Sequence, residues 1–128
     1  MPDRFRNRAL LDMMADEAEV GTWVLDLATG DSMWNAWHSS LFGFPAEPCV
    51  RRYEEFRDRL HPDEMAALEA KTAEAIATRS IFRARYRIIW PDGTIRHVRG
   101  QGRVLESEPS VMVGVVFDVT EAVEAHGG

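Results

Sequence analysis

The sequence predicts an α+β domain built on a five-stranded antiparallel sheet, with helices on one face and a flanking helix at the N-terminus. Three observations support this fold class. Residues 82–90 alternate between apolar and basic side chains, the period of a strand with one buried face. Two strand-forming segments precede a helical middle region, and two more follow residues 82–90 across turn sequences. The length of 128 residues suits one ordinary domain.

The first part of the chain predicts a helix followed by a hairpin. Residues 3–19 place their apolar side chains near one stripe of a helix, and Gly21 ends that pattern. Residues 22–27 and 32–35 are strand-forming segments on either side of a loop that contains Gly30. This arrangement is typical of a β-hairpin.

The middle of the chain predicts three helical segments. Residues 37–44 form a short helical turn, and Pro45 and Pro48 predict that the next segment is irregular. Residues 53–60 predict another short helix. A longer helix starts at the His-Pro-Asp-Glu sequence and covers residues 61–79, since proline suits the first turn and acids complement the helix dipole. Its expected buried stripe is Met65, Leu68, Thr72 and Ile76.

Three strands are expected to close the chain. Residues 82–90 form the first, and the Pro-Asp-Gly-Thr sequence at 91–94 predicts a hairpin turn. Residues 95–105 form its partner strand. A second turn at 107–110 leads to residues 111–119, the most apolar of the three.

Composition and charge limit the range of functions. The net charge of −6 argues against a nucleic-acid partner, which requires a clustered basic surface. Cys49 is the single cysteine, so no disulfide within the chain is expected and a reducing compartment is indicated. No apolar run approaches the roughly 20 residues of a membrane span, and the N-terminus has no secretory signal. We therefore expect a cytoplasmic location and no membrane association.

Five motifs in sequence resemble one known family. They are Gly21-Thr22-Trp23 with Asp26, His61-Pro62-Asp63, Tyr86-Arg87-Ile88, Pro91-Asp92-Gly93-Thr94, and Gly114 to Thr120. In this order and spacing they resemble the PAS domain, in the subclass with an HPDD-like helix start and a C-terminal D-[IV]-T. The resemblance covers residues 20–120, with residues 1–19 as a flanking amphipathic helix and 121–128 as a short tail. It implies a five-stranded sheet cupped around a pocket, and a role in signal reception or dimerisation without catalysis.

The resemblance implies a central pocket with an apolar lining. The expected lining residues are Trp34, Phe42, Met65, Leu68, Tyr86, Ile88, Val98, Gly100 and Val116. Gly100 and Gly102 would leave volume for a small apolar or aromatic ligand, and the Tyr86 hydroxyl would be its one polar contact. The alternative is a protein-interaction domain in which these side chains simply fill the core.

No cofactor is expected. The positions at which the family's photoreceptors hold a flavin with amide side chains correspond to Ile88, Val98 and Val116, which are apolar and would leave the polar edge of the ring unpaired. Cys49 lies outside the reactive cysteine motif. Haem-binding members use a histidine on the long central helix, which has none here. No residues show metal-ligand spacing.

The opposite face of the sheet predicts a subunit contact. If Gly114 and Val116 face the pocket, then the intervening residues of the last strand face outward, and apolar side chains there require a cover. The N-terminal helix could fold back over this face, or it could cover a second copy and form a homodimer, which we expect. The residues concerned are Phe5, Leu10, Met13 and Met14 of the helix and Val113, Val115 and Phe117 of the strand.

Asp118 and Thr120 match the family's junction between the last strand and a signalling helix, which Thr120 can cap. The tail is too short for a coiled coil. The sequence therefore suits either a stand-alone protein that acts through a partner such as a kinase or regulator, or a fragment of a larger receptor. A third hypothesis is a small cone-shaped enzyme of the dehydratase or isomerase kind, which would use His38 or His61 with Asp63.

Overall fold

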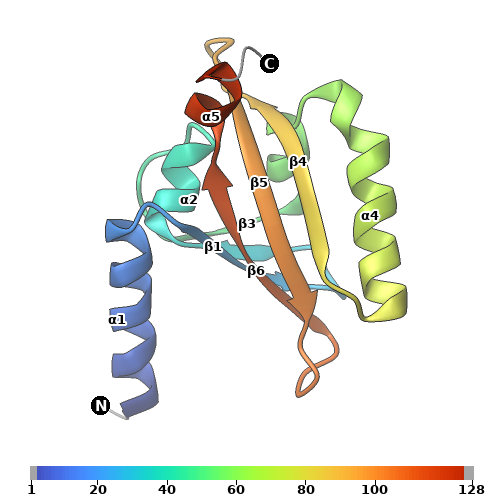
Figure 1. The fold of residues 1–128 in the computed structure, drawn as a ribbon. Coiled ribbons are helices and arrows are strands. Elements are labelled where there is room, and N and C mark those ends of the chain that lie inside the picture. Colours follow the sequence, from blue (N-terminus) through green and yellow to red (C-terminus); the bar gives the residue numbers. More distant parts are fainter. Residues whose placement is uncertain (1–2, 126–128) are drawn as a thin grey trace.

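The computed structural model describes residues 3–125, with the side chains of residues 3–9 excepted. Apart from the short strand β3 (Cys49–Arg51), helices and strands follow the order predicted from the sequence (Figure 1). The elements are α1 (Asp3–Glu17), β1 (Gly21–Asp26), β2 (Ser32–Trp34), α2 (Ala36–Leu41), β3 (Cys49–Arg51), α3 (Tyr53–Arg59), the 3₁₀ turn η1 (Pro62–Glu64), α4 (Met65–Thr78), β4 (Phe82–Ile89), β5 (Ile95–Val104), β6 (Val111–Asp118) and α5 (Thr120–Ala125).

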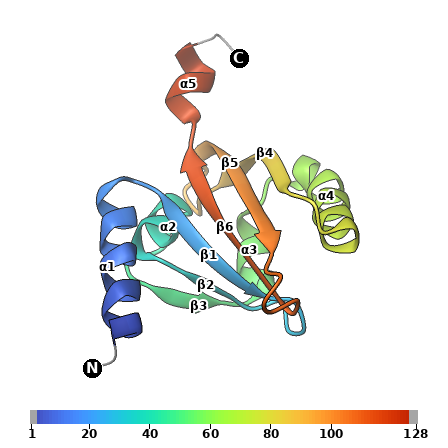
Figure 2. The ribbon, with the colours of Figure 1, turned by 60° about the horizontal axis from the view of Figure 1, so that its bottom comes forward.

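The six strands form one antiparallel sheet in the order β3-β2-β1-β6-β5-β4. The last strand of the chain thus lies between the two hairpin regions and joins them. Helices α2, α3 and α4 cover one face of the sheet (Figures 1 and 2). Helix α1 lies beside β1 and α2, and α5 leads away from the end of β6 (Figure 2). None of the described helices is both long and apolar enough to cross a membrane.

The expectation of five strands was wrong, because the segment after Pro48 forms a sixth. Strand β3 pairs with β2 at the edge of the sheet, where a strand needs hydrogen-bonding partners on one side only. The buried side chain of Arg51 fixes it there. Its guanidinium lies 3.8 Å from the ring centre of Phe44 and forms an ion pair of 3.2 Å with Glu55. Strand β3 begins directly after Pro48, so Pro45 and Pro48 do not prevent a strand in this segment.

Alternate residues of the closing strands face the helices. Ile88, Val98 and Val116 have no exposed surface, so the register that the alternation predicts is the one observed. On the same face, Trp23 of β1 is paired with Gly114, and Gly114 with Gly102. The indole of Trp23 occupies the space that side chains at both glycines would need.

The buried stripe of α4 differs in one position from the prediction. Leu68 and Ala75 are buried, whereas Ile76 is 36% exposed. Residue 75 follows Leu68 by seven positions, nearly two full helical turns, while residue 76 is rotated about 80° away from it. The start of this helical region is as expected, since Nδ1 of His61 accepts a hydrogen bond of 3.1 Å from the backbone N–H of Asp63.

We predict that Gly102→Ala destabilises the fold by about 1–3 kcal/mol, because overpacking a fixed site forces side chains and backbone to move. A Cβ at Gly102 would lie 2.4 Å from the Trp23 ring and 2.5 Å from the carbonyl oxygen of Val113. Denaturant unfolding measures the effect. Gly100→Ala is the matched control on the same strand, since its Cβ would lie no closer than 3.4 Å to a neighbour. Equal stability of the two variants would contradict the prediction.

Candidate functional site

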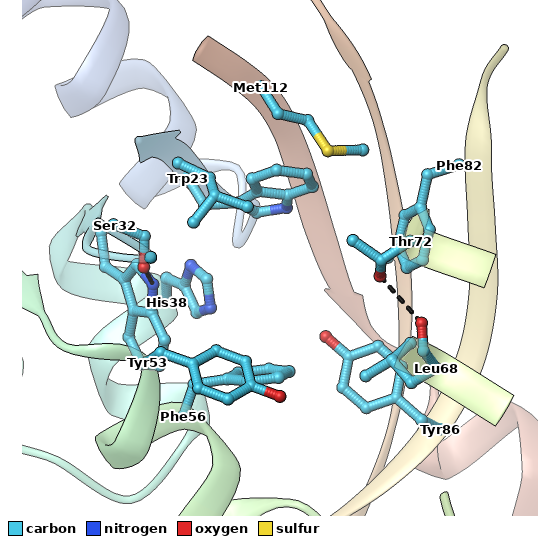
Figure 3. Close-up of a pocket in the computed structure, with 14 residues that line it drawn as sticks. Trp23, Ser32, His38, Tyr53, Phe56, Leu68, Thr72, Phe82, Tyr86 and Met112 are labelled. Atoms are coloured by element: carbon cyan, nitrogen blue, oxygen red, sulfur yellow. Dashed lines mark hydrogen bonds between the residues drawn. The ribbon is translucent and has the colours of Figure 1, made fainter. Parts of the chain in front are cut away.

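A cavity of about 130 Å³ lies between the inner face of the sheet and helices α3 and α4 (Figure 3). Four of the predicted pocket residues line it. They are Trp34, Leu68, Tyr86 and Gly100. Such a volume is comparable to cavities that hold one benzene-sized molecule.

The other predicted pocket residues do not line this cavity. Phe42, Ile88, Val98 and Val116 are fully buried within the core, and Met65 is partly buried against it. The actual walls include ten residues that the sequence argument missed: Trp23, Leu25, Gly30, Ser32, His38, Tyr53, Phe56, Thr72, Phe82 and Met112. In β1 and β2, the residues that alternate in step with Trp34 face the same side of the sheet. This pattern could have identified several of the missed residues from the sequence.

The cavity walls are largely aromatic and carry no charged side chain. The Ser32 hydroxyl accepts a hydrogen bond of 2.8 Å from the Trp34 indole, and the Thr72 hydroxyl donates one of 2.8 Å to the carbonyl oxygen of Leu68. Tyr86 is only 8% exposed, and its hydroxyl forms no hydrogen bond with the described residues. Burial raises the pKa of Tyr86, so this hydroxyl stays protonated. It points into the cavity (Figure 3).

Residue 100 is a glycine although the surrounding side chains would accommodate an added methyl group. A Cβ there would lie 3.4 Å from Cε1 of Tyr86 and 3.5 Å from Cε1 of Phe82, which is ordinary van der Waals contact. The same methyl group would lie 3.6 Å from the Tyr86 hydroxyl. Gly100 therefore differs from Gly102, whose missing side chain makes room for Trp23.

His38 forms part of the wall on the side of α2. Its ring stacks on Trp34 with centroids 3.8 Å apart, and its Nδ1–H donates to the carbonyl oxygen of Thr22 at 3.1 Å. Nε2 is buried and has no partner among the described residues. Desolvation by burial lowers the pKa of His38 from 6.5 to about 3, so the imidazole is neutral.

A hydrogen bond joins the two helices that cover the cavity. The Tyr53 hydroxyl on α3 donates to a carboxylate oxygen of Glu69 on α4 at 2.9 Å. Desolvation, together with this hydrogen bond, raises the pKa of Tyr53. Tyr53 is itself a lining residue, and it lies on the same side as Phe56 (Figure 3).

None of the residues considered for flavin binding lines the cavity. The positions expected to hold a flavin are apolar and fully buried, and the thiol of Cys49 bonds to the carbonyl oxygen of Val50 rather than lining the cavity. Helix α4 contains no histidine that could bind haem iron. Within residues 3–125 no group of three His, Cys, Asp or Glu side chains could hold a metal ion.

Of the two pairs in the enzyme hypothesis, only His61 and Asp63 lie together, with Nδ1 and a carboxylate oxygen 4.0 Å apart, and neither residue lines the cavity. No carboxylate lines the cavity beside His38, and no described carboxylate bonds to its ring. His61 instead caps the turn that contains Asp63, away from the cavity lining.

The outer face of the sheet carries an apolar row that crosses four strands. Val50, Met33, Val24 and Val113 are cross-strand neighbours in that order, and Met33 and Val50 are 42% and 53% exposed. Val115 and Phe117 extend the row along β6. Helix α1 does not cover this face: its apolar residues Leu10, Leu11, Met13 and Met14 are each more than half exposed. The side chain of Phe5 lies outside the described residues.

A compact network fixes the junction after β6. Asp118 binds the guanidinium of Arg96, and its other oxygen accepts from the Thr120 hydroxyl at 2.6 Å and the Thr120 N–H at 3.0 Å. Partial burial would raise the pKa of Asp118, but these hydrogen bonds outweigh it and lower the pKa. The Thr120 hydroxyl also accepts from the N–H of His97 at 2.9 Å, which attaches α5 to β5.

Comparisons with known proteins agree with this fold. The sequence model of the family described as PAS fold matches residues 32–116, so the chain belongs to the PAS domain family. A blue-light-activated histidine kinase of Brucella anthropi is 30% identical over 124 residues, which are 96% of this chain and 25% of the kinase. The chain thus spans about a quarter of the length of the curated relatives it matches.

Solved structures show the same fold. A sensory box histidine kinase/response regulator from Burkholderia thailandensis superposes with a TM-score of 0.76 at 23% identity, covering 91% of this chain and 89% of that one. An RNA-binding light-oxygen-voltage receptor gives a TM-score of 0.70 at 18% identity, covering 85% and 30%. Because relatives and neighbours include light-responsive proteins, the comparisons do not support the expectation that flavin is absent, and they show no ligand.

We predict that the stability of the protein falls as the pH drops from about 6.5 towards 3, through His38. The unfolded chain takes up a proton near pH 6.5, whereas the folded protein resists it until about pH 3. Protonation therefore favours the unfolded state across this window, by up to roughly 1.4 kcal/mol per pH unit. The free energy of unfolding, measured from pH 7 to 4.5, should fall less steeply in His38→Phe, which keeps an aromatic ring beside Trp34. If the free energy of unfolding depends on pH with the same slope in both proteins, His38 is not the source of the pH dependence.

Proposed function

We propose that the chain is the sensory module of a signalling protein and that its cavity binds a small apolar ligand. The observation that carries this proposal is the space beside Gly100, on a central strand where alanine would fit without strain. Membership of the PAS family and similarity to part of a histidine kinase support a sensory role. The kinase or regulator that receives the signal would be a further domain or a separate partner.

The alternative is an interaction domain with a filled core. An unfilled cavity lowers stability, by about 24 cal/mol per Å³ in core truncation series. A methyl group at residue 100 would recover part of that loss at no steric cost. A glycine there is therefore better explained by a ligand that occupies the space than by packing alone.

A second candidate is a light sensor, because relatives are blue-light-activated kinases. The residues argue against a flavin: the positions expected to hold its polar ring edge are the apolar Ile88, Val98 and Val116, which are fully buried and do not line the cavity. The cavity also has the volume of one ring rather than three. We therefore propose a ligand other than flavin. A yellow colour with structured blue absorption in the purified protein would reverse this choice.

We predict that native mass spectrometry of the gently purified protein shows a non-covalent small molecule on the chain, and that Gly100→Ala carries markedly less of it. The added methyl group takes up space in the cavity while its contacts leave the fold intact. Denaturant unfolding of ligand-free samples provides the control, and the variant should be at least as stable as the natural protein. A bare chain mass in both proteins would favour the filled-core alternative.

We further propose that the protein acts as a homodimer in which α1 of one copy covers the outer face of the other. The apolar stripe of α1 is exposed, as are Met33 and Val50 of the apolar row, and the rest of the row is half-buried, so each surface could cover the other. Charge adds to the match. Glu17 lies one helical turn after Met13, and Arg85, Arg99 and Arg103 on the outer face form no ion pair with described residues.

We predict that Met14→Glu shifts the protein from dimer to monomer in sedimentation equilibrium, because it would bury a carboxylate in the apolar contact. Met14 is 58% exposed in the single chain, so the change should leave the fold of the monomer intact. Asp12→Ala is the matched control on the same helix, away from the apolar stripe, and should stay dimeric. A dimer that persists in Met14→Glu would exclude this arrangement.

A further inference from the structure

Besides Nε2 of His38 and the proton of the Ser32 hydroxyl, which no described residue pairs, the cavity has free hydrogen-bonding groups close together at Tyr86 and Thr72. The Tyr86 hydroxyl has no partner among the described residues and points into the space between the helices and the sheet (Figure 3). The Thr72 side chain lies on the same side, and its proton is already donated to the carbonyl oxygen of Leu68. Tyr86 can therefore donate to a ligand, while Thr72 can only accept from one.

A hydroxyl group is the ligand substituent that satisfies both of these side chains. It can accept the Tyr86 proton with a lone pair and donate its own proton to Thr72. A carbonyl group could use only the first of these contacts. An anionic group is disfavoured, because no cationic side chain lines the cavity and a buried unpaired charge is costly.

The rest of the wall favours a flat aromatic ring. Trp34, Phe56 and Phe82 surround the space together with Trp23 on the sheet side. Aromatic side chains interact with aromatic ligands by offset stacking or edge-to-face contact, beyond the burial of apolar area. The volume of about 130 Å³ limits the ligand to a single ring with a small substituent.

We propose that the cavity binds a neutral, single-ring aromatic alcohol of the phenol class, with its hydroxyl group between Tyr86 and Thr72. This inference rests on the proposed ligand-binding function and specifies its chemistry. Tyr86 is then the residue that distinguishes a hydroxylated ring from a plain one, and Gly100 is the residue that makes room beside it.

Titration calorimetry with phenol, toluene, cyclohexanol and benzoate tests the proposal on the ligand-free protein. Phenol should bind more tightly than toluene or cyclohexanol, and benzoate should not bind. Tyr86→Phe should weaken phenol binding by about tenfold, the effect of one hydrogen bond, and leave toluene binding unchanged. This variant removes only an unpaired hydroxyl, so it should fold as stably as the natural protein. Gly100→Ala should weaken binding of both phenol and toluene.

Three outcomes would overturn the inference in distinguishable ways. If toluene equals phenol and Tyr86→Phe changes neither, the cavity binds apolar ligands without regard to a hydroxyl group, and only the ligand class is wrong. If benzoate binds best, an anionic class replaces the neutral one. If none of the four probes binds, both the phenol class and a ring-sized ligand site are excluded.

Discussion

The packing of one indole ring on two glycines sets the shape of the inner face. One cross-strand row runs through Trp34, Trp23, Gly114, Gly102 and Phe82. The row has large aromatic residues at both ends and glycines, which have no side chain, at its centre. The Trp23 ring can therefore lie over the middle of the sheet. Its Nε1–H donates to the carbonyl oxygen of Val115 at 3.2 Å, which fixes the ring against the strand beneath it. The cavity borders the next row at Gly100, whose partner on β4, Ala84, is also small.

The alternation of apolar and polar residues allowed the closing strands to be predicted from sequence. The period of two in β4 and the Asp-Gly turn after it determine the register, which correctly placed Ile88, Val98 and Val116 on the buried face. The family resemblance was confirmed by the family model, which matches residues 32–116. Strand β3 was missed because its stability comes from Arg51 packing on Phe44, a tertiary contact that no local pattern records.

The cavity lining was predicted less well than the sheet, for a physical reason. Alternation shows which face a residue occupies, but not whether a side chain fills the core or borders a void. Val98 and Val116 are on the expected face and are fully buried without bordering the cavity. Phe56 and Tyr53, in contrast, reach the cavity from a short helix with no buried residue of its own. The position of α3 depends on its contacts with neighbouring elements, which the sequence of α3 does not encode locally.

Strand β6 gives the inner and outer faces a common element. Val116 faces the helices, Val115 faces outward, and Asp118 at the end of the strand binds Arg96 and Thr120. A small shift of β6 caused by a ligand would therefore move the proposed dimer surface and the start of α5 together, because interiors are close-packed and transmit displacement. The Trp23 indole links the two faces directly, since it borders the cavity and bonds to the backbone of Val115. A ligand that presses on this ring would act on β6 through a hydrogen bond already in place, so the proposed signal would have a short physical route from the cavity to the end of β6.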